Sequence, residues 1–504
     1  MFRRIFLMGA IFLAGWSIGG AKAEEMAAAP SAAEAYEPYT RTIARRGTFN
    51  DQQVDYQVVL SETVLANDEG VEEAAIFSTA YLQSNGADPT ERPITFFFNG
   101  GPGSSSVWLH MGAFGPKRVA IPSDARDDGA PPFPLIDNPE SLLDVTDMVF
   151  IDPVGTGFSK ALGETEAKDF WGVHEDAASI AKFIRQWISE NGRWNSPKYL
   201  GGESYGTLRT AAVARELEGA TYNDVSLNGL ILVSTVLDMY HDITAPGNEL
   251  AWPVLLPTMA ATAWYHDALD NKPEDLEAFL DEVRGFAEGD YTVALMKGNR
   301  LGQAERSDIR TRLSGYTGLS EQFIDDAELR VSLPRFQKEL LRDRGLTVGR
   351  LDSRYTGIDY DRAGDRPDQD PSFVAIDGAY TAALNTYFRS DLGLDIAREY
   401  EIISGLGREW NWEVQGPGGP FMHNVAPFIG QAMRYNRDLR VFNAAGYYDF
   451  ATPFFSAEFS LTRNGVVPDR IVMEYYPAGH MMYVHEPSLE ALNDDIRTFI
   501  EARE

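Results

Sequence analysis

Short runs of continuous apolar residues recur along this chain, and amphipathic or polar stretches separate them. The clearest runs are Thr95–Phe98, Met148–Ile151 and Leu230–Ser234, with Arg440–Asn443 and Ile471–Tyr476 near the C-terminus. A strand covered on both faces reads as such a run, whereas a strand with one exposed face alternates. Because helix-like stretches lie between the runs, the pattern predicts an α/β fold, with a mostly parallel central sheet flanked by helices.

The pattern changes between about Val236 and Arg437, where helical, polar and charged stretches dominate. Pro273–Phe286 and Ala327–Arg344 read as helical, and Asp359–Pro371 is acidic and rich in turn-forming residues. Strand-like sequence returns after Arg437. This return favours a largely helical insertion that caps the carboxyl edge of the sheet over a separate C-terminal domain.

Ser204 stands between two glycines in the segment Gly202–Gly206, a Gly-x-Ser-x-Gly pattern. Such a pattern lets a strand turn sharply into a helix and present a serine hydroxyl. The flanks fit, because Pro197–Leu200 is strand-like and Thr207–Leu217 holds good helix formers without proline or glycine. The same pattern at Gly15–Gly19 lies in an N-terminal signal-like stretch, so the context favours Ser204 in an α/β-hydrolase sheet.

A serine hydroxyl becomes a nucleophile when an imidazole takes its proton and a carboxylate orients that imidazole. In α/β-hydrolases the acid and then the histidine follow the serine, on loops at strand ends. His480 comes directly after the run Ile471–Tyr476 and is favoured over His485, which has no comparable loop context. Asp449 follows the preceding strand-like run and is the favoured acid, with Asp238 as the second candidate and an ordinary turn aspartate as the alternative reading.

The oxyanion of an acyl-transfer reaction needs backbone amides that already point at it. In this fold one amide belongs to the residue after the nucleophile, here Tyr205, and the other to a glycine-rich loop after an early strand. Asn99-Gly100-Gly101-Pro102-Gly103 directly follows the apolar run Thr95–Phe98. Its glycines would let N–H groups approach a substrate, so we favour this role over that of a tight connecting turn.

The N-terminus has the features of a secretory signal peptide. Arg3 and Arg4 precede an apolar run, and Ala21-Lys22-Ala23 is a small-x-small cleavage site. The run is short and broken by glycines, which favours cleavage before Glu24 over a membrane anchor. We expect a signal peptide at 1–23, a flexible segment at 24–40, core at 41–235, a cap insertion at 236–437 and core at 438–504. The protein would be exported, to the periplasm or the medium.

The net charge and the lack of cysteine exclude some binding partners and some kinds of catalytic or metal site. The 504 residues contain no cysteine, so thiol nucleophiles and thiolate metal sites are excluded, and stability must come from the core. Net charge is −31, and cleavage after residue 23 would remove three basic and no acidic residues, giving −34. Such a chain is repelled by nucleic acid and anionic membranes, and neither is an expected partner.

Five blocks, in this order, together resemble the serine carboxypeptidase family of α/β-hydrolases, here in an exported, bacterial-type form. They are Asn99–Ser106, Asp152–Ser159, Gly202–Tyr205, Asp449 before Ala451-Thr452-Pro453, and Gly479-His480-Met481. The blocks span most of the chain.

The resemblance implies that Ser204 is the nucleophile, His480 the general base and Asp449 its orienting acid. It implies oxyanion contacts from the amides of Gly101 and Tyr205, and binding of a peptide's C-terminal carboxylate by Asn99, Gly100 and Glu203. Two carboxyl groups can share one site only if they share a proton, so we expect the pKa of Glu203 to be raised in the complex with a peptide.

Two positions depart from the resembled family. Ala113 stands where the relatives usually have a second glutamate that pairs with the one beside the nucleophile, and Ser104 stands where they have a cysteine. The first departure leaves the pH optimum open. The second means that the packing of the insertion differs from that of relatives with disulfides.

These features favour a serine carboxypeptidase that trims peptides with a free C-terminus through an acyl-enzyme. The alternatives are an acyltransferase or esterase on the same scaffold, and a catalytically silent binding protein. No HExxH motif is present, and the loop Gly100–Gly103 lacks the lysine of a phosphate-binding loop, so no metal or cofactor is expected.

Overall fold

The structure is a computed structural model that describes residues 36–86, 88–219, 223–414 and 424–502. The predicted signal peptide, residues 1–23, lies outside the described residues, as does most of the predicted segment 24–40. Among the described helices, none combines the length and the apolar character that a membrane span requires.

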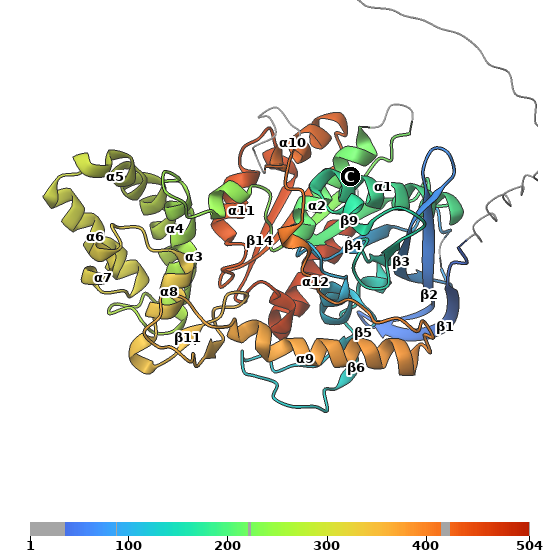
Figure 1. Cartoon of the computed structure of the whole chain (residues 1–504), viewed down its shortest axis with the longest axis horizontal. Helices are drawn as coiled ribbons and strands as arrows, with labels where there is room; N and C mark the ends of the chain where they lie inside the picture. The colour runs from blue at the N-terminus through green and yellow to red at the C-terminus, as the bar shows by residue number, and fades with distance from the viewer. Residues whose placement is uncertain (1–35, 87, 220–222, 415–423, 503–504) are drawn as a thin grey trace, which may run out of the picture. The chain divides into compact units, whose positions relative to one another are not determined.

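A single large sheet organises the fold (Figure 1). Its spatial order is β1-β2-β3-β7-β4-β9-β10-β13-β14. From β7 to β14 all neighbouring strands are parallel, while β1, β2 and β3 form an antiparallel extension that joins β7. The strands are β1 (Thr40–Phe49), β2 (Gln52–Ala66), β3 (Glu72–Gln83), β4 (Ile94–Phe98), β7 (Asp147–Ile151), β9 (Lys198–Glu203), β10 (Gly229–Val233), β13 (Arg440–Gly446) and β14 (Ile471–Tyr476).

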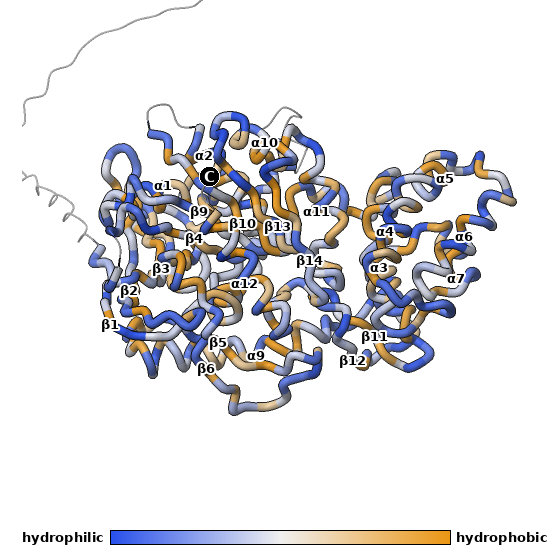
Figure 2. Tube along the Cα trace, turned by 180° about the vertical axis from the view of Figure 1, so that it is seen from behind, coloured by the Kyte–Doolittle hydropathy of each residue, from blue (hydrophilic) through white to orange (hydrophobic). Residues whose placement is uncertain are grey.

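Helices cover both faces of this sheet, which explains the continuous apolar strands. In β4, Phe96 and Phe98 point into a core shared with α1, α2 and α10, whereas Phe97 points to the opposite face, in a core shared with α9 and α12. Hydrophobic segments follow the strands when the chain is coloured by hydropathy (Figure 2). These helices are α1 (Val173–Glu190), α2 (Tyr205–Glu218), α9 (Pro371–Asn385), α10 (Ala426–Tyr435) and α12 (Glu486–Glu501).

Between β10 and β13 the chain is largely helical and builds a third apolar core. That core also takes in Tyr447, Phe450 and Phe454, which follow β13, so the helical segment packs on the loop after that strand. The helices are α3 (Ala251–Tyr265), α4 (Leu276–Phe286), α5 (Thr292–Lys297), α6 (Gln303–Thr317), α7 (Glu321–Asp326) and α8 (Leu333–Glu339), and α11 (Phe454–Leu461) follows β13. The predicted α/β-hydrolase architecture, with a mostly parallel sheet and a largely helical insertion, is confirmed.

Some boundaries and several strands differ from the sequence prediction. Ala327–Arg344 is not one continuous helix. It contains one short helix, α8 (Leu333–Glu339), and a 3-10 turn at Arg342–Arg344, and the residues between and before them are not helical. Strand β1 was not predicted, since its solvent-facing arginines and threonines leave little apolar pattern on an edge strand. The shorter strands β5 (Lys117–Val119), β6 (Leu135–Asp137), β8 (Lys160–Ala161), β11 (Thr347–Val348) and β12 (Thr356–Gly357) lie in connections.

Candidate active site

Ser204 occupies a strained turn between β9 and α2. Its backbone has φ 61° and ψ −130°, a conformation that residues with a side chain rarely adopt. The turn is fixed on both sides, because the Ser204 amide donates to the Val233 carbonyl at 3.0 Å and its carbonyl accepts the Thr207 amide at 2.8 Å. A Cβ at Gly202 would lie 2.1 Å from the Gly206 carbonyl oxygen, so the close approach of strand and helix requires glycine there.

The imidazole of His480 is held by a buried carboxylate. His480 Nδ1 lies 2.7 Å from Asp449 Oδ2. Asp449 is completely buried, and its Oδ1 accepts the amides of Ala451 at 2.7 Å and Thr452 at 2.9 Å. Burial disfavours the charged imidazole, but the charge and hydrogen bond of Asp449 outweigh it, so the pKa of His480 is raised.

Thr452 supports this pair in a way that the sequence did not reveal. Its hydroxyl donates to Asp449 Oδ2 at 2.6 Å and lies 3.1 Å from His480 Nδ1. The backbone of His480 is fixed as well, because its amide donates to the Leu351 carbonyl at 2.6 Å. These contacts orient the ring with Nδ1 toward Asp449, which leaves Nε2 as the ring nitrogen that can act on a substrate.

Ser204 and His480 line one cavity of about 240 Å³, together with Asn99, Gly100, Gly101 and Glu203. In the described part of the chain no hydrogen bond joins Ser204 to His480. Contacts of this kind are often long in a free enzyme and tighten when substrate binds. Six of the eight predicted site residues therefore line one cavity, and the other two, Asp449 and Tyr205, do not line it.

The two predicted oxyanion amides belong to adjoining segments. A Cβ at Gly100 would lie 2.5 Å from the Tyr205 nitrogen, so the glycine loop packs directly on the start of α2. Tyr205 is the first residue of α2, and a first-turn amide has no acceptor within its own helix. Gly101 has φ 105°, a left-handed conformation that favours glycine, and it lines the cavity.

Glu203 is buried, lines the same cavity and has uncharged hydrogen-bond partners. Asn99 Nδ2 donates to its Oε2 at 2.7 Å, and the hydroxyl of Tyr483 donates to Oε2 at 2.8 Å and Oε1 at 3.1 Å. Burial raises the pKa of Glu203 to about 7, although His480, Tyr483 and Asn99 each act to lower it.

Tyr483 was not identified from the sequence, and its position bears on the departure at Ala113. A Cβ on Gly112, the neighbour of Ala113, would lie 2.5 Å from the Tyr483 ring. The phenol thus approaches Glu203 beside the position where the resembled family has its second glutamate. A tyrosine three residues after the histidine carries no signal in a single sequence, because aromatic residues at that place are ordinary core residues.

The second candidates for acid and base are engaged elsewhere. Asp238 accepts the Tyr240 amide at 3.0 Å and the Asn424 side-chain amide at 2.8 Å, as an N-terminal cap. His485 Nδ1 lies 2.7 Å from the Ser488 hydroxyl at the start of α12. Neither lines the cavity that holds Ser204.

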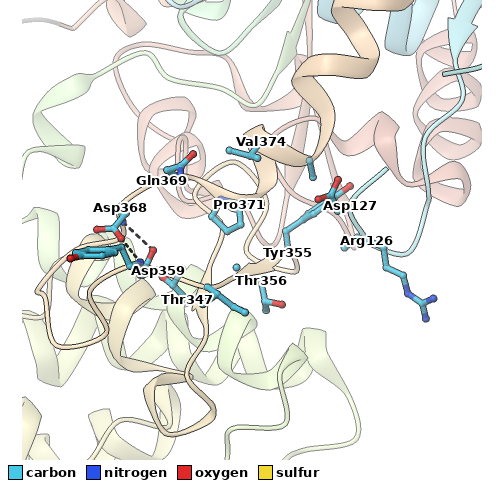
Figure 3. A pocket seen from close by; sticks show the side chains of 15 residues that line it. Arg126, Asp127, Thr347, Tyr355, Thr356, Asp359, Asp368, Gln369, Pro371 and Val374 are labelled. Carbon is cyan, nitrogen blue, oxygen red and sulfur yellow. Dashed lines mark hydrogen bonds between the residues drawn. The ribbon is translucent and has the colours of Figure 1, made fainter. Parts of the chain in front are cut away.

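A larger cavity, of about 720 Å³, lies between the acidic turn region and the start of α9 (Figure 3). None of the predicted site residues lines it. Its carboxylates are already bonded, since Asp368 accepts the Tyr360 amide at 2.6 Å and Asp359 pairs with Lys338. No group of His, Asp or Glu suited to a metal ion occurs within the described residues.

Comparisons with known proteins show which family and which fold this chain resembles. The family model described as serine carboxypeptidase matches residues 71–289, which include the glycine loop and Ser204. Serine carboxypeptidase-like 3 of Arabidopsis thaliana is 28% identical over 168 residues, 32% of this chain and 37% of that protein. Serine carboxypeptidase-like 7 of the same plant is 29% identical over 158 residues, 30% of this chain and 35% of that protein. The chain thus spans little more than a third of these relatives.

A solved structure supports the fold over a longer range. Kex1(Δ)p, a prohormone-processing carboxypeptidase from Saccharomyces cerevisiae, aligns with 88% of this chain and 91% of its own, with a TM-score of 0.53 and 15% identity. At that identity the likeness concerns the fold. The resemblance to the serine carboxypeptidase family is confirmed as a similarity: this chain is similar to the serine carboxypeptidases over residues 71–289 and has an α/β-hydrolase fold.

Proposed function

We propose that this protein is a serine carboxypeptidase that removes C-terminal residues from peptides through an acyl-enzyme. The observation that carries the proposal is the shared cavity, in which a serine on a strained turn, a histidine paired with a buried aspartate, and a buried glutamate lie together. The family match supports this reaction class.

In the proposed mechanism Ser204 Oγ attacks the scissile carbonyl carbon while His480 Nε2 takes the hydroxyl proton. The amides of Gly101 and Tyr205 hold the oxyanion. His480 then gives its proton to the leaving amine, which departs as the C-terminal amino acid and leaves an ester on Ser204. Water attacks that ester with His480 again as base, and the shortened peptide leaves with Ser204 restored.

Recognition of the terminal carboxylate is assigned to Asn99, Glu203 and the amide of Gly100. A buried glutamate with a pKa of about 7 is protonated in weakly acidic solution and can then donate a hydrogen bond to the substrate carboxylate. Above that pH it is ionised and repels the same group. We expect binding of free-acid peptides to weaken as the pH rises through about 7.

The proposal includes export and a division of the chain. Residues 1–23 would be removed as a signal peptide, 24–40 would link to the core at 41–235 and 438–504, and 236–437 would cap the site. The mature protein would act on peptides in the periplasm or the medium.

The test compares peptides with a free C-terminus and the same peptides amidated, with products followed by mass spectrometry. Trimming of the free acid, with much slower attack on the amide, is expected. Equal turnover of both forms would contradict carboxylate recognition. Turnover of esters without any peptide trimming would instead favour the acyltransferase or esterase alternative.

A further inference from the structure

One side chain in the cavity has no place in the mechanism above. Arg350 lines the cavity with Ser204 and His480, among apolar neighbours that include Trp108 and Phe373. It is exposed to solvent. Within the described ranges its guanidinium makes no ion pair and no hydrogen bond, whereas Arg354 nearby pairs with Asp352 at 2.6 Å in a buried contact.

The backbone at Arg350 is fixed to both catalytic loops. The Arg350 carbonyl accepts the Phe450 amide at 3.0 Å, next to Asp449, and the Leu351 carbonyl accepts the His480 amide at 2.6 Å. On the other side the Asp370 carboxylate accepts the amides of Arg350 at 2.8 Å and Leu351 at 3.0 Å. The cation is therefore carried on a segment whose distance from the reacting groups is set by hydrogen bonds.

Arg350 places a positive charge in the cavity of a protein whose net charge is strongly negative. The chain carries a net charge of −31, which on its own disfavours acidic peptides. Among the described residues that line the cavity, the ionisable side chains are Glu203, His480 and Arg350, and Arg350 is the only arginine or lysine. An unpaired guanidinium at the rim of an apolar pocket offers a bidentate partner for a carboxylate.

We infer that Arg350 makes the site selective for peptides with an acidic side chain on one of the two residues that flank the scissile bond. The inference rests on the proposed carboxypeptidase function and names the substrate class of that site. The carboxylate of the substrate side chain would pair with the guanidinium, while its terminal carboxylate lies at Asn99 and Glu203.

The experiment measures kcat/KM for two series of peptides, with Glu, Gln or Lys as the last or the penultimate residue. The wild type, Arg350→Gln and Arg350→Glu are compared, with Arg366→Glu as the control, because Arg366 is an exposed arginine of the same insertion that does not line the cavity. The Glu/Gln ratio within each variant is the readout, and it does not depend on the fraction of active enzyme.

In one of the two series we expect the wild type and Arg366→Glu to favour Glu over Gln by up to about fivefold, the upper end for an exposed ion pair. Arg350→Gln should bring that ratio to about one, and Arg350→Glu should favour Lys. A wild type that trims peptides without preference for acid in either series overturns the inference and leaves the proposed function intact. An equal loss for all peptides in Arg350→Gln, with the ratio retained, also overturns it. A wild type that trims no peptide overturns the proposed function itself.

Discussion

Removal of the Tyr483 hydroxyl tests how this site holds the proton on Glu203. In Tyr483→Phe the ring is kept, while the hydrogen bonds of 2.8 and 3.1 Å to the two carboxylate oxygens are lost. The phenol stabilises the ionised carboxylate more than the neutral acid, so it lowers the pKa of Glu203. Its loss must raise that pKa, and the protonated form persists to higher pH.

The size of the effect follows from the two kinds of hydrogen bond involved. A bond to a charged group contributes about 1.5–3 kcal/mol and a neutral one about 0.5–1.5 kcal/mol, so the ionised form loses about 1–1.5 kcal/mol more. Since one pH unit corresponds to about 1.4 kcal/mol, the pH limit of the protonated form moves up by about one unit. For free-acid peptides the alkaline limb of the profile should therefore move from near pH 7 to near pH 8.

The assay is kcat/KM against pH for a peptide with a free C-terminus, with a matched ester substrate that lacks the terminal carboxylate. Tyr380→Phe is the control, because Tyr380 is buried beside Gly112 but gives Glu203 no hydrogen bond among the described residues. An alkaline limb that stays in place, or moves to lower pH, in Tyr483→Phe would refute the reasoning. An equal shift in Tyr380→Phe would refute the assignment to this hydrogen bond.

Three further predictions follow from buried charges. Because burial raises the pKa of Glu203 from 4.5 to about 7, its ionisation destabilises the fold increasingly between these pH values and fully above them. Glu203→Gln should therefore be more stable than wild type to urea by roughly 3 kcal/mol at pH 8, with no gain at pH 4. Arg209→Met would leave Asp176, now paired at 2.6 Å, as a buried uncompensated charge, and should cost about 3–5 kcal/mol in urea unfolding, largely recovered when Asp176→Leu is added. Asp449→Asn should lower kcat on the order of 10⁴-fold, because the amide favours the wrong tautomer of His480 and no longer stabilises its imidazolium, and a loss below tenfold would contradict the role of Asp449.

The sequence predicted those parts of the fold that local pattern controls. Buried parallel strands such as β4 are continuous apolar runs, and the turn at Ser204 needs glycines at set positions, so both could be found without coordinates. His480 and Asp449 could be chosen as candidates because each follows a recognisable strand. Strand β1 was not predicted, because its pairing with β2, and not its own composition, makes it a strand.

The contact of Tyr483 with Glu203 could not be predicted, because it depends on side-chain packing between distant segments. Asn99 follows β4 and Tyr483 follows β14, and the two side chains meet at one carboxylate. The position of Arg350 at the cavity could not be predicted for the same reason, since it depends on hydrogen bonds between its segment and Phe450 and Asp370. Pattern predicts which residues can do chemistry, whereas packing decides what surrounds them.

The most direct test of the account is whether Ser204 is the one activated nucleophile. Wild-type protein treated with an organophosphonate, then digested and mapped by mass spectrometry, should carry one adduct, on the peptide that contains Ser204, and should lose peptide trimming in step with labelling. Ser204→Ala should take up no label and trim nothing. An adduct on another residue, or trimming that persists in Ser204→Ala, would contradict the central claim.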